Sequence, residues 1–382
     1  MAVSAIVVGA GIGGLAAAVG LRRIGWDVTV LEQAPAIGEV GAGLSLWPNA
    51  VRCLDVLGVG DAVRAHAVPA VSRGGIRLPS GTWLRRARAD DIRVLMVHRA
   101  DLHRVLLDAL PPAWLRVDAT VTGVDERADG VTVTFQTAGG EQQESADLLI
   151  SADGVDSTVR RLCWPAAPTP RFGHRTVWRA ITEPGRAPAG ESLTMGRGLQ
   201  FGMLPLPGER VYWFLTAEAT VPGLRYDDEL QEVRRRLAGW HDPIPALLAA
   251  TRPENLLHHD IVELGPVSGY RRGRVVLLGD AAHAQPPDLG QGACQALEDA
   301  VVLTAALAGQ AGLPAALDWY DQQRRPRTQT MVRAALRQAA FNERHYRLVT
   351  LAARFTPPTA WRRRVAKWTE WVPPTWNADC RS

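Results

Sequence analysis

The chain has 382 residues, of which 47% are hydrophobic and 21% charged, as expected for a globular protein of about two or three structural units. Because 43 basic residues are balanced by 39 acidic ones, the net charge of +4 does not predict a nucleic-acid partner. The four cysteines lie far apart and form no C-x-x-C pair, which excludes a disulfide scaffold and a zinc ribbon, predicts no metal site and favours a cytoplasmic location.

The first 21 residues carry no charge, so hydropathy alone would suggest a signal peptide or a membrane span. The segment has neither the basic start nor the A-x-A cleavage site of a signal peptide. Residues 5–8 instead predict a buried strand, residues 9–14 read G-A-G-I-G-G, and a helix begins at Leu15. A second strand, residues 28–31, ends at Glu32. This strand–G-x-G-x-x-G–helix–strand unit predicts a dinucleotide-binding turn.

Each residue of this motif has a physical reason to be there. Gly9 allows a tight turn, Gly11 lets the backbone approach a pyrophosphate, and Gly14 lets the helix pack on the strand. The free N–H groups at the helix N-terminus would face the phosphates. Glu32 would accept hydrogen bonds from the ribose of an adenosine.

The elements predicted next along the chain lead to a second strand that ends in a polar turn. A glycine-rich loop over residues 41–49 leads into a helix, and residues 98–107 predict an amphipathic helix with Arg99 at its start. Residues 115–135 alternate like strands, with turns expected near Gly123 and Gly130. Residues 147–151 then predict a buried strand that leads into an Asp153-Gly154 turn.

The second half of the chain contains further strands and then helices. Residues 170–220 hold several strand-like runs, with a hairpin expected at residues 205–208. Residues 274–278 predict a buried strand that ends at Gly279-Asp280, and a helix follows over residues 292–310. The tail is expected to be helical to about residue 347 and then contains tryptophan and proline.

Three buried strands therefore end in turns that are rich in glycine or contain an aspartate, at residues 9–14, 153–154 and 279–280. In a doubly wound sheet the carboxyl ends of the strands converge on one crevice. A single large ligand that touches all three turns would explain them together, whereas a small ligand would not.

Three segments carry a resemblance to a known family: V-V-G-A-G-I-G-G-L at residues 7–15, D-G-V-D-S-T-V-R at residues 153–160, and L-L-G-D-A-A-H-A-Q-P-P-D-L-G-Q-G at residues 277–292. Together they resemble the single-component FAD-dependent aromatic monooxygenases with the hydroxybenzoate-hydroxylase-like fold, among them salicylate hydroxylases, FAD-dependent urate hydroxylases and zeaxanthin epoxidase. The likeness runs from residue 3 to about residue 327. It implies an α/β fold with a Rossmann-like, doubly wound parallel sheet that binds FAD, a mixed β-sheet substrate domain and a C-terminal helical segment.

The resemblance also implies domain boundaries. Residues 1–70, 97–165 and 270–327 would form a discontinuous FAD-binding domain. Residues 71–96 and 166–269 would form the substrate domain, and residues 328–382 the C-terminal helical tail. A monomer or a homodimer is expected.

Several roles follow for matching positions. The resemblance places the ADP half of non-covalently bound FAD on Gly9, Gly11, Gly14 and Glu32, the pyrophosphate near Arg99, the adenine near the backbone of Val121, and the ribitol on Asp280. It places the flavin ring against Pro287, Gly290, Gln291, Gly292 and Ala293, where the N-terminus of a helix can stabilise negative charge on the reduced ring. It gives Asp153 a role in flavin and nicotinamide handling, and the alternative is a turn residue that caps local N–H groups.

The implied reaction uses NADH or NADPH as a transient co-substrate, because no second G-x-G-x-x-G unit follows the first. Reduced flavin would take up O₂ to give a C4a-hydroperoxide, which hydroxylates or epoxidises an electron-rich small molecule. No protein acid or base is obligatory; His283 is the one catalytic candidate, and packing in the loop is its alternative role. The competing functions are an oxidase or dehydrogenase, a non-catalytic flavin-binding protein, and a halogenase, which the single lysine, Lys367, argues against.

The substrate is expected between the flavin and the strands of residues 170–265. Candidates for the pocket wall are Gln200, Phe201, Tyr212, Met203, Trp178 and Trp213. Strand alternation allows only some of them to face inward. Urate-hydroxylating relatives place an arginine where Gln200 falls, which argues against urate and leaves salicylate-type hydroxylation or the tailoring of a natural product.

The tail raises the question of membrane association. Trp361, Val365 and Trp368 lie at i, i+4 and i+7 and would share one face of a helix among several cations. Such a stripe could rest on an anionic membrane or fold back onto its own domain. Because the helix would be short and ends before Pro373-Pro374, we expect it to fold back, without membrane association.

Overall fold

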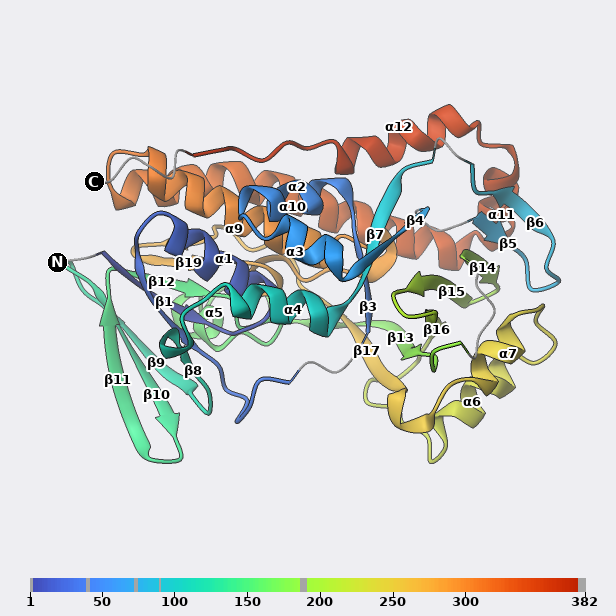
Figure 1. The fold of residues 1–382 in the computed structure, drawn as a ribbon, viewed down its shortest axis with the longest axis horizontal. Helices are drawn as coiled ribbons and strands as arrows, with labels where there is room; N and C mark the ends of the chain where they lie inside the picture. Colours follow the sequence, from blue (N-terminus) through green and yellow to red (C-terminus); the bar gives the residue numbers. More distant parts are fainter. Residues whose placement is uncertain (1–2, 39–41, 72–74, 89–90, 186–190, 377–382) are drawn as a thin grey trace.

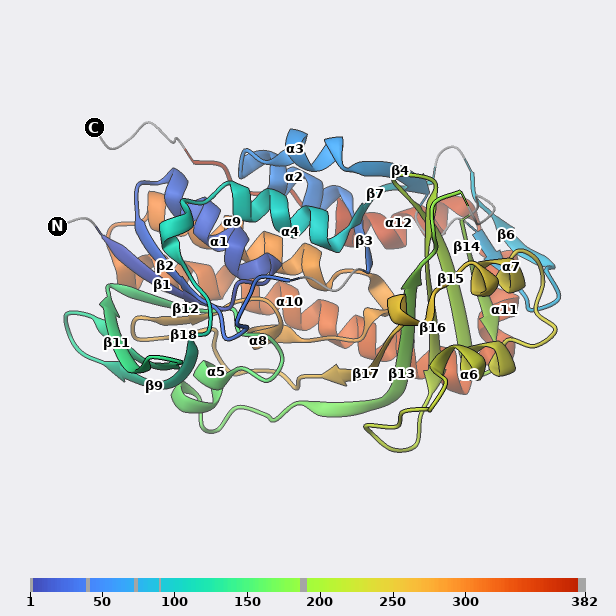
Figure 2. The same cartoon turned by 60° about the horizontal axis from the view of Figure 1, so that its bottom comes forward.

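The computed structural model describes residues 3–38, 42–71, 75–88, 91–185 and 191–376 (Figure 1). Gly41 of the predicted glycine-rich loop and Cys380 lie outside these residues. A parallel sheet with its helices occupies one end of the molecule, and a larger antiparallel sheet occupies the other (Figure 2). The long C-terminal helices run along both parts.

The first sheet is parallel except at one edge, where β18 runs antiparallel to β19. Its strands, in order across the sheet, are β18 (Arg271–Arg272), β19 (Val275–Leu277), β12 (Leu148–Ser151), β1 (Ser4–Val8), β2 (Asp27–Leu31) and β8 (Leu115–Arg116). Every residue of β12 and β19 is buried, as expected for strands covered on both faces. The chain passes from β1 to β2 on one side and later returns to β12 on the other. The topological switch point therefore lies between β1 and β12, where such sheets bind ligands.

Helices cover one face of this sheet, and its other face packs against a small antiparallel sheet formed by residues 120–146 and against Val159. The central pair is α1 (Ile12–Arg23) and α9 (Gly292–Gly309), which pack against each other. The others are α2 (Pro48–Val56), α3 (Gly60–Ala65), α4 (Arg99–Asp108), α5 (Thr158–Cys163) and the single turn α8 (Asp280–His283). The predicted strands over residues 5–8, 28–31, 147–151 and 274–278 and the predicted helices over residues 98–107 and 292–310 are thus confirmed.

Two small antiparallel sheets flank the first. One contains β11 (Gly140–Ala146), β10 (Val131–Thr137) and β9 (Thr120–Glu126), and the other contains β3 (Gly43–Leu46), β7 (Arg93–His98) and β4 (Ala67–Val71). The prediction of a turn at Gly123 is wrong, because Gly123 lies inside β9. It sits beside a register shift between Thr134 and Phe135 of β10, so this glycine marks a β-bulge.

The large second sheet is mostly antiparallel. Its strands, in order, are β17 (Leu257–Glu263), β13 (Arg171–Ile181), β16 (Arg210–Glu218), β15 (Leu199–Leu206), β14 (Ser192–Gly196), β5 (Gly75–Arg77) and β6 (Trp83–Arg86). The predicted hairpin is confirmed, since β15 and β16 pair through the turn at residues 207–209. Two helices, α6 (Glu229–Arg236) and α7 (Ile244–Ala249), share a hydrophobic core with one face of this sheet.

The C-terminal part consists of α10 (Leu313–Arg344), α11 (Tyr346–Phe355) and α12 (Pro358–Thr369). Val365 of α12 packs against the main core, as do Trp371 and Trp376 beyond it, so the predicted folding back of this segment is confirmed. Within the described ranges, no helix has the length and the apolar run needed to span a bilayer. The division into domains stays a prediction; one proposed boundary, between residues 327 and 328, falls inside the continuous helix α10.

Candidate functional site

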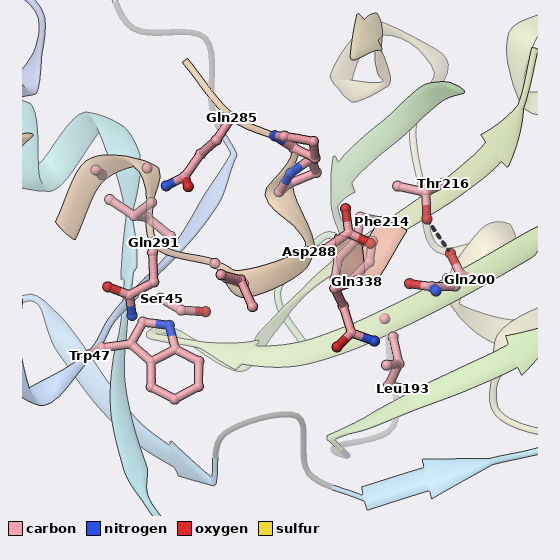
Figure 3. A pocket seen from close by; sticks show the side chains of 18 of the residues that line it. Ser45, Trp47, Leu193, Gln200, Phe214, Thr216, Gln285, Asp288, Gln291 and Gln338 are labelled. Carbon is pink, nitrogen blue, oxygen red and sulfur yellow. Dashed lines mark hydrogen bonds between the residues drawn. The ribbon is translucent and has the colours of Figure 1, made fainter. Parts of the chain in front are cut away.

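A cavity of about 560 Å³ lies where the carboxyl ends of the parallel strands meet the second sheet. Gly11, Gly154 and Asp280 line it from the three predicted strand-end turns, which the fold therefore brings together. Figure 3 shows Ser45, Trp47 and Gln291 grouped on one side of the cavity and Gln200, Phe214 and Thr216 on the other. Residues of α10, α11 and α12 line its outer end.

The three glycines of the motif have different surroundings. Gly9 has a φ of +101°, and a Cβ there would lie 2.4 Å from the Ala152 carbonyl oxygen. A Cβ on Gly14 would lie 2.0 Å from the Gly9 oxygen. A Cβ on Gly11, by contrast, would meet no heavy atom of the described residues within 4 Å. Gly9 and Gly14 are thus required by the fold itself, whereas Gly11 leaves open space at the N-terminus of α1, which fits the approach of a pyrophosphate.

Glu32 holds the motif in place from the end of β2. Its Oε2 accepts a hydrogen bond from the Ala10 N–H at 2.8 Å, and its Oε1 accepts one from the Ala34 N–H at 2.9 Å. Glu32 does not line the cavity, and neither does Val121, which is buried in β9. Their proposed contacts with ribose and adenine stay predictions.

Asp153 is occupied by its own turn. Its Oδ1 accepts a hydrogen bond from the Ser151 hydroxyl at 2.5 Å, and its Oδ2 accepts one from the Val159 N–H at 3.1 Å. The cavity is lined by its neighbours Ala152 and Gly154. This geometry fits the alternative role of Asp153 as a capping residue, and a role in flavin or nicotinamide handling stays a prediction.

The Gly279-Asp280 turn presents a carboxylate to the cavity. Asp280 is exposed, lines the cavity, and has no hydrogen-bond or ion-pair partner among the described residues. Gly279 has a φ of +63°, and its N–H donates to Asp299 Oδ2 at 2.9 Å. Asp299 therefore fixes the backbone of the turn, and the Asp280 carboxylate stays available to a polyol such as ribitol.

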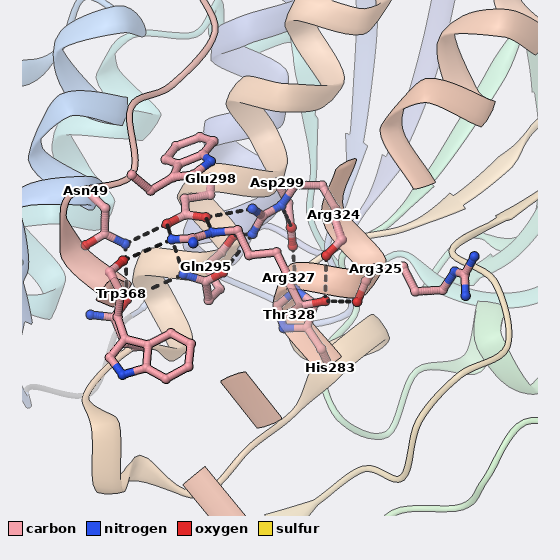
Figure 4. Close-up of polar contacts among 12 residues, drawn as sticks. Asn49, His283, Gln295, Glu298, Asp299, Arg324, Arg325, Arg327, Thr328 and Trp368 are labelled. Atoms are coloured by element: carbon pink, nitrogen blue, oxygen red, sulfur yellow. Dashed lines mark hydrogen bonds and ion pairs between the residues drawn. The ribbon is translucent and has the colours of Figure 1, made fainter. Parts of the chain in front are cut away.

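Behind this turn lies a buried network of charges that the sequence did not predict (Figure 4). Asp299 accepts hydrogen bonds from His283 Nε2 and from Arg324 Nε, both at 2.6 Å. Glu298 accepts from Arg324, from Arg327 and from Asn49. Burial acts to raise the pKa of Glu298 and of Asp299, but Arg324 and the other donors outweigh it and lower both. Both carboxylates therefore stay ionised and fix α9, α8 and α10 to one another.

His283 belongs to this network rather than to the cavity wall. Its side chain is buried and donates to Asp299, and it does not line the cavity. The geometry therefore favours its alternative role, as a residue that holds the loop in place, over the catalytic one.

The segment before α9 forms the floor of the cavity. Pro287, Gly290, Gln291, Gly292 and Ala293 all line it, and α9 begins at Gly292. The first N–H groups of α9 therefore face the cavity, as the flavin-ring assignment requires. Arg99 also lines the cavity, at the start of α4.

The substrate candidates divide between the two faces of the second sheet. Gln200 and Tyr212 line the cavity. Phe201 does not fit the predicted role, because it lies on the opposite face and stacks on Trp213 with ring centroids 5.6 Å apart. Trp178 and Met203 lie in that same core, which α6 and α7 cover. Strand alternation explains the division.

Sequence reasoning missed other parts of the wall. Asp288 forms a buried ion pair with Arg175 of β13, and the α10–α12 helices contribute side chains such as Phe341 and Trp361. Arg175, Phe341 and Trp361 are far from the recognised motifs along the chain, and although Asp288 lies inside one of them, no local pattern could have indicated its partner. Trp47 Nε1, Gln285 Oε1 and Ser192 Oγ are buried without a hydrogen-bond partner among the described residues, and all three residues line the cavity. Such orphaned polar atoms indicate a place for a polar ligand.

Comparison with known proteins agrees with this geometry. A family model described as "FAD binding domain" matches residues 2–335. The chain is 37% identical over 340 residues to the aurachin C monooxygenase/isomerase of Stigmatella aurantiaca, which covers 87% of this chain and 88% of that protein. It is 37% identical over 339 residues to an FAD-dependent urate hydroxylase of Klebsiella pneumoniae, which covers 86% of this chain and 87% of that protein.

Solved structures give the same result. Klebsiella pneumoniae HpxO complexed with FAD and uric acid superposes with a TM-score of 0.88 at 32% identity, covering 97% of each chain. A salicylate hydroxylase substrate complex has a TM-score of 0.79 at 23% identity, covering 97% of this chain and 96% of that one, and supports the fold.

Proposed function

The chain belongs to the FAD-binding-domain family and is an FAD-dependent monooxygenase, and we propose that it hydroxylates an electron-rich aromatic or heteroaromatic ring bound between Gln200 and the start of α9. NADH or NADPH is the transient reductant typical of the family. The observation that carries the proposal is the single cavity that joins three strand-end turns to the second sheet.

The residues present fit FAD. Gly11 and Arg99 would hold the pyrophosphate, Asp280 the ribitol hydroxyls, and the N-terminus of α9 the flavin ring. When bound, FAD supplies the redox chemistry by which O₂ is activated and one oxygen atom is transferred. The chain itself positions the substrate ring and excludes water from it, through apolar side chains such as Leu193 and Phe214.

The residues of the cavity wall favour a substrate whose ring carries a polar or anionic substituent. Arg179 of β13 lines the cavity and has no hydrogen-bond or ion-pair partner among the described residues, so it can bind a carboxylate or phenolate oxygen. Burial raises the pKa of Tyr212, so its hydroxyl stays neutral and can donate. Gln200 carries no charge, which disfavours urate as the substrate. The hydroxylated ring acids named for relatives, 3-amino-4-hydroxybenzoate and 6-hydroxynicotinate, have the chemistry that this wall would accept.

The test is a screen of hydroxylated aromatic and heteroaromatic acids for stimulation of NAD(P)H oxidation, with the product mass measured. A product heavier by one oxygen atom supports the proposal. Stimulated oxidation that yields only hydrogen peroxide would indicate an oxidase, and bound FAD without any NAD(P)H oxidation would indicate a flavin-binding protein.

A pair of variants tests the substrate anchor. Arg179→Met should raise the KM of an acidic substrate by roughly 10- to 100-fold, since a hydrogen bond to a charged group contributes about 1.5–3 kcal/mol. Arg171→Met is the control, because Arg171 lies on the same strand but is exposed and paired with Glu263. An unchanged KM in Arg179→Met would contradict the assignment.

A further inference from the structure

The helix α11 has two apolar faces, and only one of them is buried. Tyr346, Val349 and Ala353 pack against the small core formed by Ile76, Leu193 and Met195. Leu348, Leu351 and Phe355 lie on the other face, at i, i+3 and i+7, and are 55%, 55% and 68% exposed. Phe341 at the end of α10 is a further exposed apolar side chain, at 44%. Exposed apolar side chains gathered on one helix mark an interaction surface.

The charged side chains of α11 and α12 all have one sign. Residues 346–369, which form α11 and α12, contain six basic side chains and no acidic one. All six are exposed: Arg347, Arg354, Arg362, Arg363, Arg364 and Lys367. Arg347 and Arg354 lie on α11 itself, between its inner and outer apolar faces. Arg364 lines the cavity, so we call Leu348, Leu351 and Phe355, together with the other five cations, the α11–α12 face.

We propose that the α11–α12 face docks on an anionic lipid bilayer. Apolar side chains on an amphipathic helix enter the headgroup region, while the surrounding cations bind anionic lipids. Docking through the same face of a second copy is disfavoured, because a two-fold contact would bring the arginines of both copies together. This surface is distinct from the Trp361–Trp368 stripe considered in the sequence, whose Val365 packs on the protein core.

The position of the face relates docking to the cavity. Ala352, Thr356 and Ala360 line the cavity, and Ala352 and Ala360 are also exposed, so this end of the cavity opens beside the α11–α12 face. In Figures 1 and 2, α11 and α12 lie at the end of the molecule that also carries β5, β6 and β14. A substrate with an apolar substituent could then pass from the bilayer to the cavity; this consequence, unlike the docking, rests on the proposed function.

The experiment is co-sedimentation of the full-length, FAD-containing protein with vesicles of phosphatidylcholine containing about one third phosphatidylglycerol. We expect binding to these vesicles, weakened by high salt, and little binding to pure phosphatidylcholine. The variant Leu348→Gln/Leu351→Gln/Phe355→Gln should lower the partition coefficient at least about tenfold. Arg347→Gln/Arg354→Gln should lower it roughly 30-fold, since both basic residues lie near the anionic surface.

The matched control is Leu162→Gln/Val221→Gln/Leu224→Gln, which removes three exposed apolar side chains from other elements and should leave binding unchanged. FAD content and melting temperature establish that each variant is folded. Absence of binding to the anionic vesicles would overturn the proposal, as would an equal loss in the control. A dimeric mass by light scattering that becomes monomeric in the α11 variant would also overturn it, in favour of a contact between two copies. None of these readouts depends on enzymatic activity.

Discussion

Single methyl groups added to the glycine motif can separate its role in ligand binding from its role in folding. Gly11 has φ and ψ of −71° and 176°, which alanine adopts without strain, and a Cβ there meets no atom of the described residues within 4 Å. Gly11→Ala should therefore leave the melting temperature of the FAD-free protein unchanged or slightly higher, since such replacements stabilise by about 0.4–1 kcal/mol.

The same methyl group should obstruct the cofactor. If the pyrophosphate approaches the backbone at Gly11, the added Cβ displaces it and weakens charge-assisted hydrogen bonds that contribute about 1.5–3 kcal/mol each. We expect the FAD dissociation constant to rise roughly 10- to 100-fold. The assay is titration of the FAD-free protein with FAD, followed by flavin fluorescence, together with thermal unfolding with and without FAD.

The control is Gly14→Ala, in which the Cβ would lie 2.0 Å from the Gly9 backbone oxygen. Because both groups belong to the backbone and cannot move apart easily, this variant should lose at least the roughly 1–3 kcal/mol of unfolding free energy typical of overpacking. Its melting temperature without FAD should therefore be lower than that of the wild type. Wild-type FAD affinity in Gly11→Ala would refute the placement of the pyrophosphate at this turn.

Three further predictions follow from the site and its supports. Asp280→Ala and Arg99→Ala should each weaken FAD binding by about 1.5–3 kcal/mol, measured by the same titration; full flavin content and unchanged affinity in both would show that these assignments are wrong. Arg324→Met should cost about 3–5 kcal/mol of unfolding free energy at neutral pH, because it removes the buried cation that two buried carboxylates share and leaves Glu298 with Arg327 and Asp299 with His283. Since the pKa values of Glu298 and Asp299 are lowered in the folded protein, their stabilisation is present above pH about 4 and is lost as the pH falls further, and this acid dependence should be weaker in Arg324→Met; an equal dependence in both proteins would contradict it. Truncation after Phe355 should lower the melting temperature, because it removes the packing of Val365 and Trp371 on the core; an unchanged melting temperature would show that the segment is not part of the folded unit.

Local patterns in the sequence predicted the parallel sheet and its ligand turns well. The β1–α1–β2 unit, the strands β12 and β19 and the start of α9 each combine a short apolar run with a neighbouring glycine or acid. These features depend on neighbouring residues, so they can be read from short windows. Gly123 shows where the same reasoning fails, because a glycine in a β-bulge and a glycine in a turn look alike in one strand when its partner is unknown.

The rest of the site depends on contacts between distant parts of the chain. The pair Arg175–Asp288 and the cluster of Glu298, Asp299 and Arg324 join different elements, and no spacing in the sequence predicts that they meet. Gln200 points into the cavity and Phe201 points to the opposite face of the second sheet. Which residue takes which direction depends on the face that α6 and α7 cover. Alternation along a strand predicts that these residues divide between two faces but not which of them face the cavity.

The most direct test of the central claim is a single-turnover reaction of the FAD-bound enzyme with NAD(P)H, isotopically labelled O₂ and an aromatic acid selected by the screen. The account predicts that the product gains one oxygen atom that carries the label, in proportion to the NAD(P)H consumed. Labelled hydrogen peroxide together with an unmodified aromatic compound, for every ligand that stimulates NAD(P)H oxidation, would contradict it.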